Sequence, residues 1–153
     1  MINPASPPRR RIGLEEMVYV NLLHTSDVLS RRVSEVLKVE DISPTQYNVL
    51  RILRGDQDGI PCGEIAQRMI TRDPDITRLL DRLEKRGLIS RWRRKEDRRV
   101  VLARILPEGF RLLSRLDGPI ERNHRRQLGH LGRRRLKRLA DLLNACRKGD
   151  SKG

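Results

Sequence analysis

The stretch from Ile60 to Leu106 constrains the fold of this 153-residue chain more than any other segment. It reads IPCGEIAQRMITRDPDITRLLDRLEKRGLISRWRRKEDRRVVLARIL. Apolar residues recur at its centre with the i, i+3, i+4, i+7 spacing of an amphipathic helix. They are Ile76, Leu79, Leu80 and Leu83. The opposite side of this helix is polar and free to meet a partner. It carries Thr77, Arg78, Asp81, Arg82 and Lys85.

The ends of this helix are also marked in the sequence. Asp73 is the predicted N-cap, and Pro74 is predicted at the first helical position, where a missing N–H costs nothing. Asp75 then adds a negative charge near the positive end of the helix dipole. Gly87 is predicted to end the helix in a left-handed conformation. A shorter helix, from about Gly63 to Met69, is expected to pack beneath it.

Two β-leaning runs follow Gly87, namely Leu88–Trp92 and Val100–Ile105. The turn between them, Arg93–Arg99, holds four Arg and one Lys in seven residues. This pattern predicts a hairpin with a basic tip, so the order of elements is that of a winged helix-turn-helix. Such a tip favours a DNA contact, because a narrow minor groove attracts inserted Arg side chains. A structural hairpin with a solvated turn is the alternative.

Five segments in order, SPTQYNVLRIL, GEIAQRM, DITRLLDRLEKRGLI, EDRRVVL and PEGFRLL, resemble the MarR family of transcriptional regulators. The resemblance runs from about Leu14 to Cys146. It implies a homodimer whose two winged-helix lobes bind a pseudo-palindromic operator in double-stranded DNA. It also implies a small, often aromatic or phenolic ligand that binds between the dimer frame and the DNA-binding lobe. One departure is Leu106, which stands where the family usually has a Thr that caps the next helix, so that helix relies on Pro107 and Glu108.

The residues expected to contact DNA follow from the helix pattern and from the resemblance. Contacts in the major groove are assigned to the polar helix, because an Arg side chain can bind guanine O6 and N7. The candidate residues are Pro74, Asp75, Thr77, Arg78 and Arg82. Phosphates or the minor groove are assigned to the hairpin turn; its candidates are Arg94, Lys95, Arg98 and Arg99. Asp97, part of the family's D-R-R signature, is expected to orient a neighbouring Arg rather than to touch DNA.

Three residues are candidates for the ligand pocket: Tyr19, His24 and Tyr47. Buried Tyr and His side chains belong more often to a core, which is the competing interpretation. His24, His124 and His130 show no metal-ligand spacing. No metal or other cofactor is therefore assigned, and no catalytic constellation is found, so an enzyme is not expected.

The formal net charge of +14 favours phosphate backbones through counterion release and predicts salt-dependent binding. An anionic membrane is the competing target, but the chain shows no long apolar run, secretory signal or lipidation motif. We therefore expect a cytoplasmic protein without a membrane partner. Aromatic residues are only 3%, which disfavours a base-stacking platform for single strands.

The two cysteines, Cys62 and Cys146, are too few and too far apart for a disulfide framework. Cys62 precedes the first helix of the DNA-binding pair, where a redox sensor could act. The sequence shows no neighbouring His or basic cluster that would lower its pKa. A small, partly buried side chain is therefore the favoured interpretation.

The expected fold is mostly α (α+β), with a single domain over residues 14–147. Its DNA-binding lobe covers about residues 43–106, and helices over 14–39 and 107–147 form a dimerisation domain, since their apolar edges need a second copy to cover them. Residues 1–13 and 148–153 are expected to be tails, the first of them disordered and basic. Arg133, Arg134 and Arg135 crowd the first turn of the last helix, where cations oppose the helix dipole.

The leading hypothesis is thus a sequence-specific, homodimeric regulator, a repressor released by a small ligand. A non-specific architectural DNA-binding protein and a cysteine-based redox-sensing regulator are the alternatives.

Overall fold

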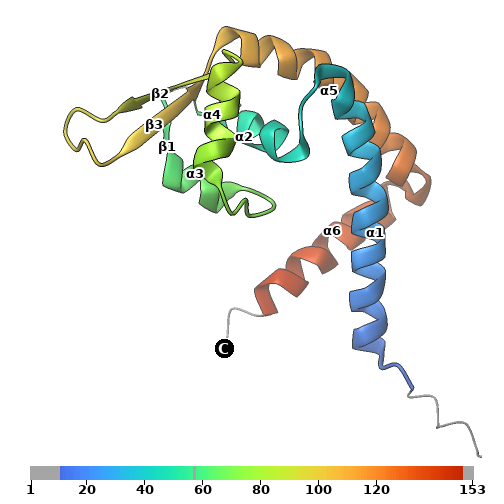
Figure 1. Ribbon diagram of the computed structural model, residues 1–153. Helices are drawn as coiled ribbons and strands as arrows, with labels where there is room; N and C mark the ends of the chain where they lie inside the picture. Colours follow the sequence, from blue (N-terminus) through green and yellow to red (C-terminus); the bar gives the residue numbers. More distant parts are fainter. Residues whose placement is uncertain (1–10, 57, 150–153) are drawn as a thin grey trace, which may run out of the picture. The chain divides into compact units, whose positions relative to one another are not determined.

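The computed structural model describes residues 11–56 and 58–149, which are mostly helical and include one small sheet (Figure 1). Tertiary contacts divide the chain within helix α1 (Leu14–Leu37) into two units, Met1–Arg31 and Arg32–Gly153. The predicted basic tail lies outside the described residues except for residues 11–13. The predicted fold class, mostly α with a winged helix-turn-helix lobe, is confirmed.

The first unit contains the first three quarters of α1. This helix exposes a series of large apolar side chains, including Tyr19, which is 62% exposed. The others are Leu14, Met17, Val18, Val20, Leu22, Leu23 and Val28. Arg31 forms an ion pair with Asp27 one turn earlier, at 2.8 Å.

The second unit begins with the last turns of α1, followed by the 3₁₀ helix η1 (Lys38–Glu40). Helix α2 (Pro44–Arg54) comes next, and its start is well defined. The Ser43 hydroxyl accepts the main-chain N–H of Gln46 at 3.1 Å, and the Gln46 side chain accepts the N–H of Ser43 at 3.0 Å. This reciprocal pair is a capping box, which satisfies two otherwise unpaired donors. Helix α2 therefore starts at Pro44, with Ser43 as its N-cap.

Helices α3 (Cys62–Arg68) and α4 (Ile76–Lys85) follow, and three short strands join them into one lobe (Figure 1). The strands are β1 (Ile60–Pro61), β2 (Ile89–Arg93) and β3 (Val101–Ile105), in the antiparallel order β1-β3-β2. In the hairpin, Ile89 pairs with Ile105 and Arg93 with Val101. The predicted hairpin is therefore confirmed.

Helix α5 (Pro107–Leu128) starts against this lobe and contributes Leu112, Leu113 and Leu116 to its core. A Cβ at Gly109 would lie 2.5 Å from the main-chain oxygen of Leu88, so only glycine permits this close approach. Leu106 supplies no side-chain cap, as the sequence indicated. Its main-chain N–H instead donates to the oxygen of Leu88 at 2.9 Å.

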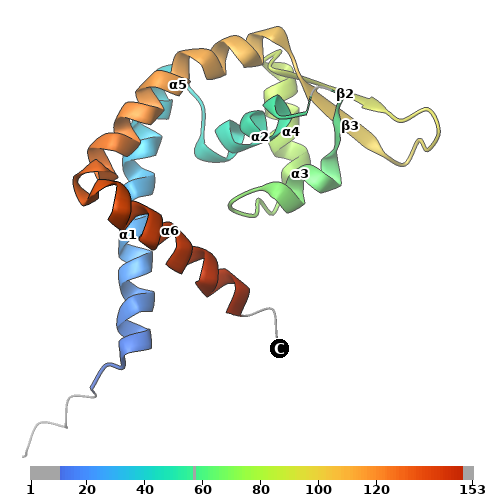
Figure 2. The same ribbon diagram turned by 180° about the vertical axis from the view of Figure 1, so that it is seen from behind.

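The chain reverses after α5 through the 3₁₀ helix η2 (Gly129–Leu131) and continues as α6 (Gly132–Gly149) (Figure 2). Gly132 has φ +73°, a left-handed conformation that favours glycine. The helical region over residues 107–147 is thus divided into two helices at this turn. None of the described residues of α6 is buried. None of the described helices is both long and apolar enough to cross a membrane.

Candidate nucleic-acid interface

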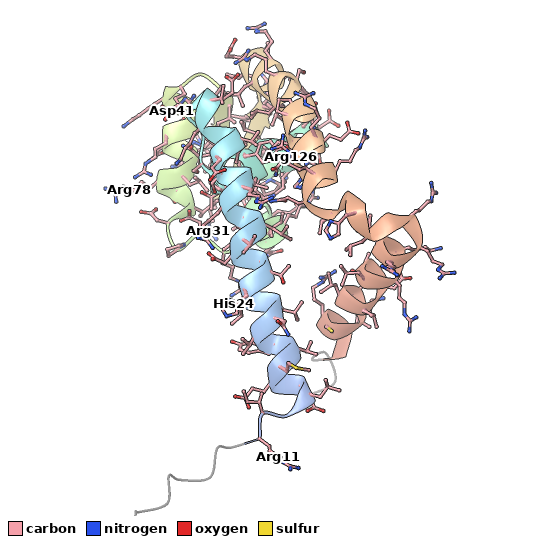
Figure 3. The ribbon with its side chains drawn as sticks, turned by 90° about the vertical axis from the view of Figure 1, so that its right-hand side faces the viewer. Arg11, His24, Arg31, Asp41, Arg78 and Arg126 are labelled. Atoms are coloured by element: carbon pink, nitrogen blue, oxygen red, sulfur yellow. The ribbon has the colours of Figure 1, made fainter. Side chains whose placement is uncertain are left out.

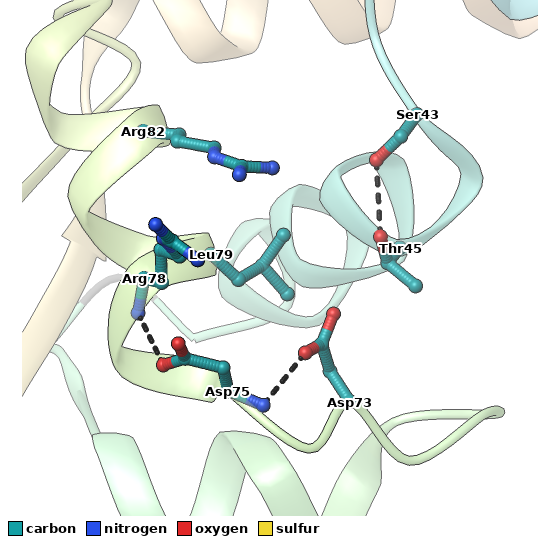
Figure 4. A pocket seen from close by; sticks show the side chains of 7 residues that line it. All are labelled: Ser43, Thr45, Asp73, Asp75, Arg78, Leu79 and Arg82. Carbon is teal, nitrogen blue, oxygen red and sulfur yellow. Dashed lines mark hydrogen bonds between the residues drawn. The ribbon is translucent and has the colours of Figure 1, made fainter.

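Helix α4 is the structural candidate for the recognition helix, and its first residue differs from the prediction. The carboxylate of Asp75 accepts the main-chain N–H of Arg78 at 3.0 Å, so Asp75 is the N-cap and the helix starts at Ile76. Asp73, the predicted cap, instead accepts the N–H of Asp75 at 2.9 Å (Figure 4). That bond across two residues stabilises a turn. Pro74 therefore lies in the turn before the helix, and the predicted start was wrong by two residues.

The other end of α4 confirms the prediction for Gly87, which has φ +68°. The N–H of Gly87 donates to the oxygen of Glu84 at 2.9 Å, and the N–H of Leu88 donates to the oxygen of Leu83 at 3.1 Å. These two bonds form a Schellman motif, which satisfies the last carbonyl groups of a helix. The chain can therefore turn directly from α4 into β2.

The two faces of α4 differ as its periodicity predicts. Leu79, Leu80 and Leu83 are at most 5% exposed and join the core of the lobe. The exposed face carries Thr77, Arg78, Arg82 and Lys85. Figure 3 shows Arg78 projecting outward from the lobe. Burial of the leucine face thus fixes the helix with its polar side accessible to a large partner.

Asp81 is an exception to this pattern, because its carboxylate is bound within the protein and is not free to contact DNA bases. Its carboxylate forms an ion pair with Arg91 of β2. The same guanidinium binds Glu84 through Nε at 3.1 Å and Nη2 at 2.7 Å. Burial acts to lower the pKa of Arg91, but the hydrogen bonds to Glu84 and Asp81 outweigh it, so the pKa is raised. Arg91 therefore stays charged and joins the recognition helix to the wing.

The wing turn is shaped by its own main-chain bonds. Arg94 donates its N–H to the oxygen of Val100 at 2.9 Å, which closes the loop. The carboxylate of Asp97 accepts the main-chain N–H of Arg99 at 3.0 Å, and Arg93 donates from Nη1 to the oxygen of Arg98 at 2.8 Å. Asp97 thus bonds to the main chain of a neighbouring Arg. The turn exposes Lys95, Arg98 and Arg99, whereas Arg94 is half-buried.

A hollow of about 210 Å³ separates the start of α2 from the start of α4 (Figure 4). Arg78 and Arg82 line it from α4, and Ser43 and Thr45 line it from α2. Asp73 and Asp75 also line it, so the hollow combines guanidinium, hydroxyl and carboxylate groups. The sequence does not indicate that Ser43 and Thr45 are neighbours of the recognition helix, because only the tertiary packing of α2 against α4 brings them there.

The three residues considered for a ligand pocket belong to different units. Tyr47 lies in the core of the second unit, 8% exposed, with the guanidinium carbon of Arg51 5.8 Å from its ring centre. Tyr19 and His24 are exposed residues of α1 in the first unit, and Figure 3 labels His24 on this helix. The burial of Tyr47 fits the core interpretation.

Cys62 is the first residue of α3 and is half-buried, whereas Cys146 is exposed. Burial raises the pKa of the Cys62 thiol, although the charge of Arg91 acts against this effect. Within residues 11–56 and 58–149, no group of three or more His, Cys, Asp or Glu side chains is arranged to hold a metal ion.

A helix pair with an exposed polar recognition helix and a basic hairpin defines a winged-helix DNA-binding protein. Residues 42–101 match the family model of the MarR family. A MarR transcription factor from Planctomyces limnophilus, known from a crystal structure, is 39% identical, with 89% of this chain and 99% of that chain covered and a TM-score of 0.69. The chain therefore belongs to the MarR family of DNA-binding transcriptional regulators.

Two further similarities agree with this assignment. The HTH-type transcriptional regulator FarR of Neisseria gonorrhoeae is 25% identical over 126 residues, which cover 82% of this chain and 86% of FarR. A mutant MarR from E. coli, crystallised in complex with operator DNA, has the same fold, with a TM-score of 0.77 and 24% identity. The similarity covers 86% of this chain and 95% of the MarR chain.

Proposed function

We propose that this regulator binds a pseudo-palindromic operator as a homodimer, represses transcription there, and is released by a small aromatic or phenolic ligand. The observation that carries the proposal is the exposed polar face of α4, which Arg91 ties to a basic wing. One rigid element can then enter a major groove while the next contacts the adjacent backbone or minor groove.

Sequence readout is assigned to the exposed face of α4, through Thr77, Arg78 and Arg82. A guanidinium can form two hydrogen bonds with guanine O6 and N7, which carries sequence information. Asp75 already accepts the N–H of Arg78, so its role is to fix the start of the helix. Pro74, in the turn just before, is assigned an apolar contact at the edge of the same groove.

The wing supplies the contacts that do not depend on base sequence. Lys95, Arg98 and Arg99 are exposed at its tip, and Arg94 lies at its base. Such cations bind phosphates or a narrow minor groove. Asp97 holds the turn that presents them, through its bond to the main chain of Arg99.

The homodimer is supported by apolar surface that the single chain leaves exposed. Leu139 and Leu142 on α6 are 38% and 56% exposed, and α1 exposes the series of apolar residues described above. A second copy can bury both surfaces. A two-fold dimer places two recognition helices in successive major grooves about 10 base pairs apart, so the symmetry of the operator follows from that of the protein.

Release by a ligand requires different affinities for the DNA-competent and DNA-incompetent states. A tenfold weakening of operator binding corresponds to about 1.4 kcal/mol of coupling. An aromatic acid or phenol suits a crevice that is partly apolar and basic. Tyr19 and His24, both exposed on α1, are the candidate contacts, whereas the buried Tyr47 belongs to the core of the second unit. Cys62 and Cys146 are assigned no part in release.

The deciding experiment selects bound fragments from genomic DNA and then measures competition with bulk DNA. A specific site bound at least about a thousandfold more tightly than random DNA is expected of a regulator. The selected sites should show inverted repeats with half-sites one helical turn apart. Uniform affinity for all fragments would support the architectural alternative and contradict the proposal.

A further inference from the structure

The excess positive charge is concentrated outside the DNA-binding lobe. Residues 122–138 hold seven Arg and one Lys and contain no Asp or Glu. The lobe, residues 43–106, holds 15 Lys and Arg against nine Asp and Glu. The shorter segment therefore carries the larger net charge. We name its eight cations the distal basic cluster: Arg122, Arg125, Arg126, Arg133, Arg134, Arg135, Lys137 and Arg138.

The distal basic cluster spans the end of α5, the turn η2 and the first two turns of α6. All eight of its side chains are exposed, so none of them serves the core. Arg126 lies on α5, and η2 returns the chain so that α6 follows directly (Figures 2 and 3). The cations therefore extend over two connected helices.

The cluster also differs from the rest of the chain in how its cations are paired. Elsewhere, long-range ion pairs hold Arg54 to Asp117 and Arg115 to Glu40, each at 2.8 Å. Among the described residues of the cluster, only Arg125 forms an ion pair, with Glu121. Among the described residues, the five cations of the cluster that lie on α6 thus form no ion pair, although Asp141 follows them on the same helix.

This arrangement opposes the stability of α6. Arg133, Arg134 and Arg135 occupy the first turn, where each cation costs about 0.3–1 kcal/mol against the helix dipole. Arg134 and Arg138 are also four residues apart on one face, and like charges at that spacing repel. No packing or pairing offsets these costs within the described chain. An anionic partner would offset them.

We propose that the distal basic cluster is a second DNA-binding surface, which contacts the sugar-phosphate backbone of a duplex segment other than the one in the lobe. A lobe bound to DNA would keep this polyanion at high effective concentration near the cluster. Helix α5 starts at the lobe, and the first residue of the cluster, Arg122, lies 15 residues further along it, which is about 23 Å of helix. A membrane surface fits less well, because the first two turns of α6 contain only Leu136 as an apolar residue.

The test compares two variants of equal charge. The first changes Arg133, Arg134, Arg135 and Arg138 to Gln. The matched control changes four exposed cations elsewhere, Arg32, Lys38, Arg147 and Lys148, to Gln. Binding to a 30-base-pair duplex of random sequence is measured by fluorescence anisotropy over a range of KCl concentrations. No operator is needed, so the result is independent of the proposed repression and ligand release.

The cluster variant should reduce the slope of log K against log salt by about 3.6 if four phosphate contacts are lost, whereas the control should keep the parent slope. The parent, bound to a bead-linked duplex, should also capture a second labelled duplex, and the cluster variant should capture at least fivefold less. A variant with Arg98→Gln and Arg99→Gln, both in the wing, should bind the first duplex more weakly. Neutralising the four cluster arginines in this variant should still lower the slope of log K against log salt by the same amount as in the parent.

Parental slope and parental capture in the cluster variant would overturn the proposal. A loss confined to binding of poly-glutamate or of phosphatidylserine vesicles would also overturn it, in favour of an acidic protein or a membrane. Melting curves separate binding from folding, because removing cations from the first turn of α6 should leave the melting temperature equal or higher. Lys at the same four positions should restore the parental slope.

Discussion

Arg91 of β2 binds Glu84 of α4 with both its main chain and its side chain. Its N–H donates to Oε1 at 3.0 Å, and Nε donates to Oε2 at 3.1 Å. The carboxylate of Glu84 therefore holds strand β2 against helix α4. The side chain of Arg91 is 19% exposed, so water screens this contact less than it screens a surface ion pair.

The first prediction concerns this link. Arg91→Met should lower operator affinity more than affinity for random DNA. The substitution removes the ion pairs that fix the angle between the recognition helix and the wing, and it leaves the side chains proposed to contact DNA in place. Arg91→Lys should restore part of the specificity, since it keeps the charge but loses the forked hydrogen bonds. The ratio of the two dissociation constants is the measurement. A purely structural role would lower the melting temperature and leave that ratio unchanged.

A second prediction separates the helix from the wing. Arg78→Ala should cost about 1–3 kcal/mol on the operator and much less on random DNA, because a bidentate base contact carries sequence information. Arg98→Ala or Arg99→Ala should weaken both DNAs more evenly and flatten the salt dependence. Titrations at several salt concentrations measure both effects. Equal losses on the two DNAs for Arg78→Ala would remove this residue from the base-reading set.

Acid should weaken the contact between η1 and α5. Glu40 accepts two hydrogen bonds from Arg115, each at 2.8 Å, and the bonds from Arg115 lower the pKa of this carboxyl below its ordinary value of 4.5. A lowered pKa in the folded state means that the pair stabilises the fold above the ordinary value, and that this stability is lost as pH falls through the lowered value.

Glu40→Gln should therefore reduce the melting temperature at neutral pH and have a smaller effect near pH 3. Glu121→Gln is a suitable control, because the Glu121–Arg125 pair is largely exposed and contributes little. Thermal melts of the three proteins at both pH values test the prediction. A Glu40→Gln effect that is the same at both pH values would contradict it.

Replacement of two glycines in α5 should have opposite effects. Gly109→Ala should destabilise the fold by about 1–3 kcal/mol, because the new methyl group would lie 2.5 Å from the Leu88 oxygen. Gly118→Ala meets only the flexible end of Arg122, at 3.2 Å, and should stabilise the helix by up to about 1 kcal/mol. Urea unfolding provides both values. Similar values for the two variants would show that the lobe and α5 are loosely packed.

The last prediction concerns the thiols. Burial raises the pKa of Cys62, which reduces the fraction of reactive thiolate at neutral pH. A variant with Cys62→Ser and Cys146→Ser should bind the operator like the parent, and low micromolar peroxide should affect neither protein. Release by a small ligand should persist in both. Loss of parental binding with peroxide, together with immunity of the double variant, would establish the redox alternative.

Most of the lobe could be predicted from the sequence, because its helix ends and its hairpin are determined by residues that lie close together along the chain. Capping by Ser43 and the left-handed Gly87 depend on residues within one turn of the chain. The start of α4 was missed because Asp73 and Asp75 are both good caps, and only the turn geometry decides between them. The pairing of Asp81 with Arg91 joins a helix to a strand, and no helical periodicity contains that information.

Leu88 links helix α4 to helix α5, and this link bears on how the proposed ligand could act on DNA binding. Its N–H bonds to the end of α4, its carbonyl oxygen accepts the N–H of Leu106 at the start of α5, and Gly109 packs directly on that oxygen. The main chain of one residue thus connects the recognition helix to the helix that leaves the lobe. We therefore expect a displacement of α5 to move α4 with it. In the proposed dimer, a ligand that moves α5 would change the spacing between the two lobes, while the surface of each lobe proposed to read DNA would keep its shape.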